Sequence, residues 1–554
     1  MKSRTNRKYK PEQYQHAASS RIYSTVSVKP ACDTIYKISK PTHKIYISIS
    51  ASTILSNTLF VVQANNFKTK SIIKLHKETP MTGHHFDQIY IGGAWVDPVG
   101  GDKIPVVNPA TESTIGAVPA GTVDDVNAAV DAAKSSFPSW WRTPVEIRAG
   151  YLRAVAEKLT ARRDEIALLI SSEMGSPVRF SSDVQVSLPV NSFLEAASVA
   201  ESFEWEAERG NSIIVREPVG VVGAITPWNY PLHQIAGKVA YALAAGNTIV
   251  VKPSEESPLN AWVLAEIMDE VGVPPGVFNL VSGTGLVVGE ALASHPDVEL
   301  VTFTGSTRAG IRVGELAAKT IKRVTLELGG KSANLILPGT DLSVAIPHAI
   351  DWAFINSGQT CLALTRLLVH RDDLRDVELA ASALASKLSV GAPDAPSTDL
   401  GPLVSEVQMQ RVRKYIEDGI RDGARLIAGG SDRLADLPIG YYVRPTILSD
   451  VTPNMSVFRE EIFGPVLSIV PYDSIDEGVR IANNSMYGLA GSVWSNNSQT
   501  AREIANQIRT GQIMINGGEF NPNAPFGGYK QSGIGREFGP EGLSEFLEIK
   551  SFQY

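Results

Sequence analysis

Short apolar runs alternate with helical patterns between residues 219 and 330, and this alternation constrains the fold more than any other feature. Five runs have the length and apolar content of buried strands: Val219–Thr226, Asn247–Ser254, Val277–Gly283, Leu300–Ser306 and Arg323–Gly330. Stretches with helical spacing lie between them. Strands that alternate with helices form a parallel, doubly wound sheet, so we predict an α/β fold.

A second block of alternating strands and helices begins at Ser332. The chain has 554 residues, which is enough for more than one domain, and we predict two doubly wound domains at 81–330 and 331–542. Ahead of the first sheet, the sequence predicts a strand pair at Gln88–Val96 and a helix at Asp183–Ala207. Two alternating runs, Asn211–Pro218 and Ser544–Tyr554, have no evident partner strand.

Residues 1–80 differ in charge from the rest of the chain. They carry 14 Lys and Arg against 3 Asp and Glu, whereas the whole chain has a net charge of −7. The Ser-rich apolar run Ile45–Ala64 is weakly similar to a signal peptide, and the low acidity is weakly typical of a transit peptide. We prefer a third interpretation, in which residues 1–80 are a disordered leader or an artefact of a start site upstream of Met81.

The overall composition excludes several classes of function. The acidic balance does not indicate nucleic acid, and no apolar run reaches the length of a membrane span. The chain has two cysteines, which excludes a disulfide framework and fits a reducing compartment, so we expect a cytoplasmic protein. We expect no metal site.

One of the two cysteines, Cys361, lies inside the predicted second domain, in the stretch GQTCLALTR. A lone cysteine is more often a buried structural residue than a nucleophile. Polar groups at the predicted strand ends favour the nucleophile over the structural cysteine, because ligands of parallel sheets bind beyond the carboxyl ends of the strands. Four such groups occur: Thr226–Asn229, Lys252–Glu255, Gly305–Ser306 and Glu327–Gly330.

Seven motifs, in order along the chain, resemble those of the NAD(P)-dependent aldehyde dehydrogenases of the hydrolytic, non-acylating type. They are TPWNYP (226–231), KPSEESP (252–258), FTGST (303–307), LELGGKS (326–332), GQTC (358–361), EEIFGPV (460–466) and PFGGYKQSGIGRE (525–537). The resemblance covers nearly everything after Met81. It implies an NAD-binding domain at 81–330, a catalytic domain at 331–542, and a β oligomerisation arm built from strands near 208–218 and 543–554.

The resemblance implies catalytic roles for five residues. Cys361 would attack the aldehyde as a thiolate, and Asn229 would donate to the oxyanion of the resulting thiohemiacetal. Glu327 would activate the water that hydrolyses the thioester, although it could equally be a carboxylate that caps a turn. Lys238 and Glu537 would lie near the route of water and protons, or form a surface ion pair.

The resemblance also implies that the first sheet binds NAD. Lys252 and Glu255 would hold the adenine-side ribose, and the carboxylate would repel the 2′-phosphate of NADP, so that NAD is favoured. Ser306 would bind the pyrophosphate at a helix N-terminus. Glu461 and Phe463 would hold the nicotinamide ribose and ring, although Phe463 could be plain core. The remaining cofactor residues would be Ile225, Thr226, Pro227, Trp228, Ser254, Gly305 and Leu328.

The resemblance places the substrate in a tunnel beside Cys361 and does not identify the aldehyde. The residues expected to line this tunnel are Tyr230, Gly237, Thr360, Leu362, Glu519, Phe520 and Phe526. Gly237 stands where relatives carry a bulky side chain, which predicts a roomier tunnel. The two strands without partners would pair with a neighbouring subunit, giving a homodimer or homotetramer.

Two other functions remain open from the sequence. One is an acylating dehydrogenase that passes the acyl group to coenzyme A, although such relatives generally lack a glutamate at the position of Glu327. The other is a non-catalytic structural protein on the same fold, which would tolerate loss of Cys361 or Glu327.

Overall fold

The computed structural model describes residues 36–40, 43–47 and 86–554. In the first part, β1 (Tyr36–Lys40) pairs antiparallel with β2 (His43–Ile47). The rest of the predicted leader, residues 1–80, lies outside the described residues, and its interpretation stays a prediction. Residues 86–554 belong to one compact unit, which holds everything discussed below.

The first sheet of this unit has eight strands in the order β21-β13-β12-β9-β10-β11-β3-β4. Its parallel strands are β9 (Val221–Ile225), β10 (Thr248–Lys252), β11 (Phe278–Leu280), β12 (Leu300–Thr304) and β13 (Arg323–Glu327). Most of their residues are buried, as expected for parallel strands covered on both faces. The predicted strand pair forms β3 (Ile89–Ile91) and β4 (Ala94–Val96) at the edge. The predicted parallel sheet is therefore confirmed.

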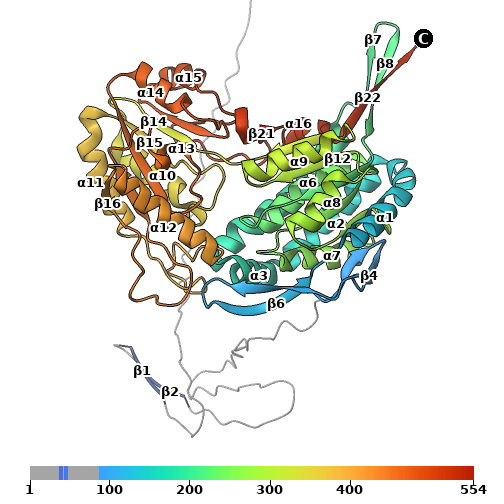
Figure 1. The fold of residues 1–554 in the computed structure, drawn as a ribbon, viewed down its shortest axis with the longest axis horizontal. Helices are drawn as coiled ribbons and strands as arrows, with labels where there is room; N and C mark the ends of the chain where they lie inside the picture. The colour runs from blue at the N-terminus through green and yellow to red at the C-terminus, as the bar shows by residue number, and fades with distance from the viewer. Residues whose placement is uncertain (1–35, 41–42, 48–85) are drawn as a thin grey trace, which may run out of the picture. The chain divides into compact units, whose positions relative to one another are not determined.

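Helices cover both faces of the first sheet (Figure 1). Those along the chain between its parallel strands are α6 (Pro231–Ala245), α7 (Leu259–Val271), α8 (Glu290–Ser294) and α9 (Thr307–Ala318). The helices that precede it are α1 (Val123–Trp141), α2 (Val145–Ala161), α3 (Arg163–Met174), α4 (Val178–Phe180) and α5 (Ser187–Ser202). A hairpin of β5 (Lys103–Asn108) and β6 (Ser113–Pro119) also precedes α1.

The second sheet has seven strands in the order β16-β17-β18-β15-β14-β19-β20. The strands are β14 (Ala333–Ile336), β15 (Arg366–His370), β16 (Arg425–Ala428), β17 (Thr446–Ser449), β18 (Val466–Tyr472), β19 (Gly491–Trp494) and β20 (Met514–Ile515). All pair in parallel except β16 at one edge. Its helices are α10 (Leu342–Phe354), α11 (Leu374–Ala385), α12 (Glu406–Arg421), α13 (Ser456–Arg459), α14 (Ile475–Asn483) and α15 (Ser498–Ala505).

The end of the chain returns from the second sheet to the first. β21 (Gly533–Ile534) pairs antiparallel with β13, so that Gly533 lies opposite Glu327. The following helix α16 (Gly539–Ser544) packs against α5 and α6. Residues 533–544 therefore lie on the first sheet and its helices, although the sequence places them largely in the second domain.

A three-stranded arm projects from the unit (Figure 1). It consists of β7 (Glu206–Arg209), β8 (Ser212–Pro218) and β22 (Leu547–Gln553). The predicted helix 183–207 is wrong at its end, because α5 stops at Ser202 and β7 follows. The two strands without evident partners pair with each other, with Ser212 opposite Gln553 and Pro218 opposite Leu547. In the part of the chain that the structure describes, no helix is long and apolar enough to cross a membrane.

Candidate active site

Cys361 lies on a loop that a left-handed turn positions. Helix α10 ends at Phe354, because Asn356, Ser357 and Gly358 all have positive φ, at 53°, 56° and 73°. A side chain at Gly358 would overlap the carbonyl oxygen of Gly464, so only glycine fits there. Asn356 Nδ2 ties the turn to the Asn229 carbonyl at 3.0 Å. The turn reverses the chain at the end of α10 and brings Cys361 to the first sheet.

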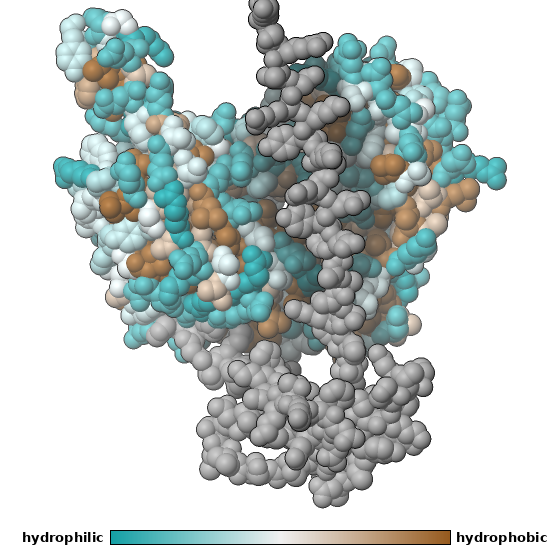
Figure 2. All heavy atoms as spheres, turned by 180° about the vertical axis from the view of Figure 1, so that it is seen from behind, coloured by the Kyte–Doolittle hydropathy of each residue, from teal (hydrophilic) through white to brown (hydrophobic). Residues whose placement is uncertain are grey.

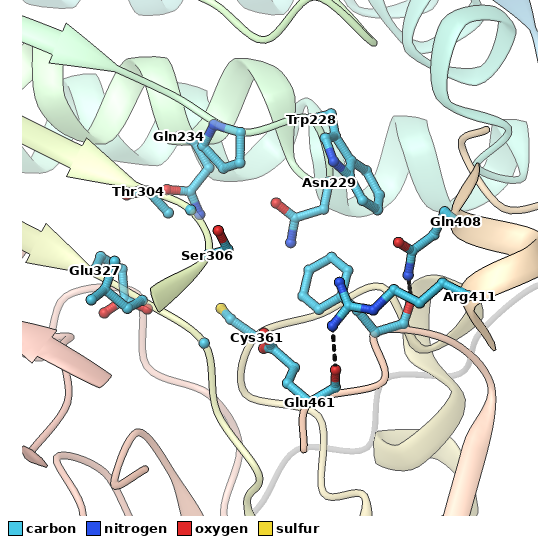
Figure 3. A pocket seen from close by; sticks show the side chains of 15 residues that line it. Trp228, Asn229, Gln234, Thr304, Ser306, Glu327, Cys361, Gln408, Arg411 and Glu461 are labelled. Carbon is cyan, nitrogen blue, oxygen red and sulfur yellow. Dashed lines mark hydrogen bonds between the residues drawn. The ribbon is translucent and has the colours of Figure 1, made fainter. Parts of the chain in front are cut away.

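Two cavities, each of about 150 Å³, meet at Cys361. The first is bounded by the carboxyl ends of the first sheet and by the loop at Glu461, and Figure 3 shows its walls. The second is mostly apolar and is lined by aromatic rings, including those of Phe520 and Phe526. Cys361 and Gln234 belong to the walls of both. A molecule in either cavity can therefore reach the same thiol.

Asn229 follows β9 and is fixed through its backbone and its side chain. Its carbonyl accepts hydrogen bonds from Asn356 Nδ2 and from Gln185 Nε2 at 3.3 Å. Its Nδ2 donates to the Gln359 carbonyl at 3.0 Å, two residues before Cys361. That bond takes one of the two amide hydrogens. The amide nitrogen points toward the Cys361 loop in Figure 3, so the second hydrogen is available to an oxygen formed beside the sulfur.

Glu327 is the last residue of β13 and is buried, with 3% of its surface exposed. Neither carboxyl oxygen has a hydrogen-bond partner among the described residues. Burial, followed by the negative charge of Glu537, raises the pKa of Glu327 well above its ordinary value. Burial and then the charge of Glu327 also raise the pKa of the Cys361 thiol. In Figure 3 the sulfur is turned toward the side on which Glu327 lies.

Buried Lys238 and partly buried Glu537 form an ion pair near Glu327. Lys238 Nζ also donates to Thr304 Oγ1 at 2.7 Å. Thr304 lines the first cavity and Glu537 lines the second, so this hydrogen-bonded group connects the two. The alternative of a surface ion pair is wrong, because Lys238 has 1% of its side chain exposed. Thr304 belongs to the FTGST motif, but no role was predicted for it.

The predicted cofactor residues divide into two neighbouring groups. Those that line the first cavity are Pro227, Trp228, Gly305, Ser306, Leu328, Glu461 and Phe463. The others, Ile225, Thr226, Lys252, Ser254 and Glu255, lie at the carboxyl ends of β9 and β10. The backbone N–H of Thr226 donates to the Lys252 carbonyl at 3.1 Å, which holds these two strand ends together.

These residues fit a dinucleotide. The hydroxyl of Thr226 is buried without a partner in the described part of the chain, and Ser306 caps α9 in the cavity wall. Lys252 Nζ contacts Glu255 Oε2 at 2.6 Å, so a carboxylate with a fixed orientation stands at the strand edge. A carboxylate at such an edge suits ribose hydroxyls, and a helix N-terminus suits a pyrophosphate.

Two residues that the sequence did not single out, Gln408 and Arg411, hold the loop at Glu461 and Phe463. Gln408 Nε2 donates to the Phe463 carbonyl at 2.7 Å, and Arg411 Nη2 donates to the Glu461 carbonyl at 2.7 Å. Phe463 has a positive φ of 62°, and its ring lies perpendicular to that of Trp228 at 5.3 Å. Gln408 and Arg411 lie three residues apart on α12, but no local motif marks such spacing as functional.

Five predicted substrate residues line the second cavity: Tyr230, Thr360, Leu362, Phe520 and Phe526. The residues that line it include neither Gly237 nor Glu519, both of which the structure describes. Glu519 is exposed, and a Cβ on Gly237 would lie 3.2 Å from the ring of Phe538. Phe538 therefore fills the space that Gly237 leaves, in contrast to the roomier tunnel expected from the sequence. His233, Gln234 and Trp352 line this cavity and were not predicted to do so.

Comparison with known proteins agrees with this arrangement. A family model described as the aldehyde dehydrogenase family matches residues 95–552. The 3-succinoylsemialdehyde-pyridine dehydrogenase of a Pseudomonas species is 49% identical over 472 residues, which cover 84% of this chain and 98% of that protein.

Solved structures give the same result. Aldehyde dehydrogenase C from Pseudomonas syringae, in complex with NAD+ and octanal, is 45% identical with a TM-score of 0.84, and the match covers 85% of this chain and 97% of that one. An aldehyde dehydrogenase from Mycobacterium tuberculosis, complexed with NAD+, is 44% identical with a TM-score of 0.83, over 85% of this chain and 98% of that one. The resemblance of the motifs and the fold class are thus confirmed, and the chain belongs to the aldehyde dehydrogenase family of oxidoreductases.

Proposed function

We propose that this protein uses NAD to oxidise an aldehyde to its carboxylic acid, through a thioester on Cys361 that a water activated by Glu327 hydrolyses. The observation that carries the proposal is the position of Cys361 in the walls of two cavities. One cavity lies at the sheet edge whose residues fit a dinucleotide, and the other is apolar. The complexes of two relatives with NAD+ support this choice of cofactor.

The reaction starts with proton transfer from the Cys361 thiol. The raised pKa of the thiol means that it needs a base, and Glu327, whose pKa is also raised, is the buried carboxylate beside it. The sulfur bonds to the aldehyde carbon, and the electron pair of the C=O bond moves to the oxygen. Asn229 Nδ2 donates to that oxygen. Loss of one such donor typically costs about 3–4 kcal/mol of barrier.

The carbon attached to sulfur would lose a hydride to form a thioester, and bound NAD would supply the acceptor for that hydride. Trp228 and Phe463 would wall the nicotinamide side of the cavity, and Glu461 would reach the nearby ribose. Glu255 would hold the adenine-side ribose, and its charge disfavours a 2′-phosphate. Equal catalytic efficiency with NAD and NADP would contradict this assignment of Glu255.

Hydrolysis of the thioester uses the same groups again. After the proton taken from the thiol has passed to bulk water, Glu327 takes a second proton from the attacking water. The hydroxide oxygen bonds to the thioester carbon, the C–S bond breaks, and Glu327 returns its proton to the Cys361 thiolate. Because neither Glu327 oxygen has a partner in the described part of the chain, both are available to water. The presence of this carboxylate favours release of a free acid over transfer to coenzyme A.

Replacement of the thiol tests the proposal most directly. Cys361→Ala should abolish NADH formation with a panel of aldehydes, while calorimetry still detects NAD binding. Near-normal turnover of this variant would refute the role of Cys361. In the unmodified protein, aldehyde oxidation should not require coenzyme A, and a strict requirement for it would indicate an acylating enzyme instead.

We also propose that the arm mediates assembly into a homodimer or homotetramer. Figure 2 shows apolar atoms at the surface of the arm, which lies at the upper left of that view. On β22, Ile549 is 73% exposed and Phe552 is 42% exposed. In the sheet order β22-β8-β7, both outer strands leave a free edge. Exposed apolar side chains on an unpaired edge favour pairing with another chain.

A further inference from the structure

Phe538 has a backbone conformation that aromatic residues rarely adopt. Its φ is 64° and its ψ is 160°, a combination that glycine alone adopts without strain. The chain nevertheless carries an aromatic side chain at this position, and only 3% of the residue is exposed. Backbone strain of this kind persists where the surrounding structure enforces it, and it is concentrated at functional sites. The strained backbone therefore points to a function of the Phe538 ring.

Hydrogen bonds on both sides of Phe538 hold its conformation. Before it, the backbones of Glu537 and Phe526 exchange two hydrogen bonds of 2.7 Å. After it, the Gly539 N–H donates to the Tyr241 hydroxyl at 2.9 Å. Phe526 belongs to the wall of the second cavity and Tyr241 belongs to α6. Phe538 is therefore fixed between that cavity and that helix.

The ring of Phe538 covers a part of α6 that has no side chain of its own. It stacks on His233, with ring centroids 5.4 Å apart and planes 12° apart, and it lines the second cavity. One turn further along α6 is Gly237, where an added Cβ would lie 3.2 Å from the ring, closer than ordinary van der Waals contact. The width of the cavity on the side of α6 therefore depends on a ring that comes from residue 538.

The second cavity has room for a body of about one aromatic ring. Its volume is about 150 Å³, comparable to that of a cavity in another protein that binds benzene. The described residues that line it include several aromatic side chains and neither lysine nor arginine. Such a wall selects uncharged molecules, and it discriminates among them by volume and shape.

We propose that Phe538 sets the width of the substrate cavity and thereby determines which aldehydes the enzyme accepts. With the ring in place, the cavity admits uncharged aldehydes whose body is about one aromatic ring wide and excludes wider ones. This inference rests on the proposed oxidation of aldehydes at Cys361. Phe538 acts through its shape, so its replacement should change the choice among aldehydes and leave the chemical step itself in place.

Two aldehydes that differ by one fused ring test the proposal: benzaldehyde and 1-naphthaldehyde. For the unmodified enzyme, kcat/KM should favour benzaldehyde by about tenfold or more. Phe538→Gly removes the ring and relieves the backbone, and it should raise kcat/KM for 1-naphthaldehyde about tenfold, a gain that general damage to the fold cannot produce. Gly237→Leu combined with Phe538→Gly returns apolar volume from α6 and should restore much of the preference for benzaldehyde.

The strained backbone provides a second measurement. Phe538→Ala removes the same ring but keeps a Cβ at a positive φ, so it should unfold at a lower temperature than Phe538→Gly. Phe193→Leu is the control, because Phe193 is a fully buried ring on α5 that does not line the second cavity. This control should lower the melting temperature and leave the preference between the two aldehydes unchanged.

Binding of two ketones, acetophenone and 1-acetylnaphthalene, measures the width of the cavity without turnover, because neither can be oxidised to an acid in this reaction. Calorimetry should show that the unmodified protein prefers acetophenone and that Phe538→Gly reduces this preference. If the unmodified protein accepts both sizes equally, or if Phe538→Gly keeps the preference, the proposal is overturned. If no aldehyde is oxidised at all, the proposed function fails, and the ratio of ketone affinities decides the role of Phe538 separately.

Discussion

Cys361 and Glu327 each resist ionisation in this protein, and the charge of Glu327 makes ionisation of the Cys361 thiol harder. Both are desolvated, and the negative charge of Glu327 adds to the raised pKa of the thiol. A state in which the two groups share one proton is therefore lower in free energy than a state in which both groups are ionised. Under the proposed mechanism, the second hydrogen of Asn229 Nδ2 would stabilise the negative charge on the substrate oxygen. Asn229, Glu327 and Cys361 together would therefore stabilise negative charge on the reacting substrate more than negative charge on the free enzyme.

Replacement of Glu327 by Gln should separate the two halves of the reaction. An amide cannot take a proton from water, and loss of a general base typically costs about 10²–10⁴-fold. If the thiol can still ionise, a single-turnover experiment should show a burst of about one equivalent of NADH per site, followed by slow turnover. Hydroxylamine should accelerate the slow phase, since it attacks a thioester without help from a base. Absence of the burst would mean that Glu327 acts earlier, and unaffected turnover would make it structural.

The pH dependence of hydrolysis should reveal the charges around Glu327. Only the ionised carboxylate can act as the base, so its raised pKa predicts that the rate falls on the acid side at a higher pH than for an ordinary carboxylate. Lys238 favours the ionised form and Glu537 disfavours it. Lys238→Met should therefore move the acid limb of the kcat profile to higher pH, and Glu537→Gln should move it to lower pH. Shifts in the same direction for both variants would contradict this electrostatic explanation.

Motifs predicted residues that the fold brings to the wall of one cavity, but they did not predict residues that hold this wall from elsewhere in the chain. Asn229, Glu327 and Cys361 lie within short runs with recognisable spacing, and the fold brings them to one place. Gln408 and Arg411 reach the Glu461 loop through carbonyl oxygens, which any sequence supplies, so no motif records the contact. Gly237 shows the opposite failure, because its side-chain space is filled by Phe538 from 301 residues away in the sequence.

At the scale of elements, we expect the left-handed turn 356–358 to tolerate substitution poorly. Three successive residues with positive φ occur where α10 would otherwise continue, and each non-glycine one costs about 1–2 kcal/mol. The hydrogen bonds of Asn356 and Ser357, to the carbonyls of Asn229 and Gly401, offset this cost. The sequence does not predict where α10 ends, because helical periodicity contains no information about the contacts of this turn with the residues after β9.

Gly358→Ala should damage the enzyme through this turn. The added methyl overlaps the Gly464 carbonyl, so the loop must move, and a displacement of about 1 Å at a reacting group can cost about 10²-fold in rate. We expect a fall in kcat of at least tenfold and a lower melting temperature. Gly314→Ala, in the middle of α9 with open space around it, is the matched control and should leave activity intact and stability equal or slightly higher. Wild-type activity in the first variant would refute the importance of the turn.

At the scale of the whole molecule, the arm makes the oligomeric state testable. Removal of residues 547–554 deletes β22 and leaves β8 unpaired on one side. The truncated protein should lose its assembly, shown by light scattering coupled to size-exclusion chromatography, or aggregate through the new edge. A milder variant, Ile549→Lys with Phe552→Lys, keeps the strand and should reduce the molecular mass to that of the monomer. A full-length protein that is already monomeric would rule out the proposed assembly.

The alternation of strands and helices was enough to predict both sheets, but it did not predict which strands from the end of the chain pair with β13 and β8. Pairing of β21 with β13 and of β22 with β8 joins segments separated by about two hundred residues or more, for which local patterns give no partner. β21 has two residues, which is too short to register as a strand in any pattern of alternation. A single boundary at residue 330 does not describe the return of the C-terminal segment to the first sheet.

Because β21 and β22 lie near the end of the chain, the strands that they pair with remain incomplete until late in synthesis. When the ribosome has synthesised residue 330, the strands β9 to β13 all exist, yet the free edges of β13 and β8 still lack their partners. Those partners emerge only within the last residues of the chain. A nascent chain therefore carries two open strand edges while residues 328–532 are synthesised, and chaperones that shield such edges would be needed during this interval. Ribosomes stalled shortly before residue 533 should present an aggregation-prone protein, whereas release of the final segment should end that risk.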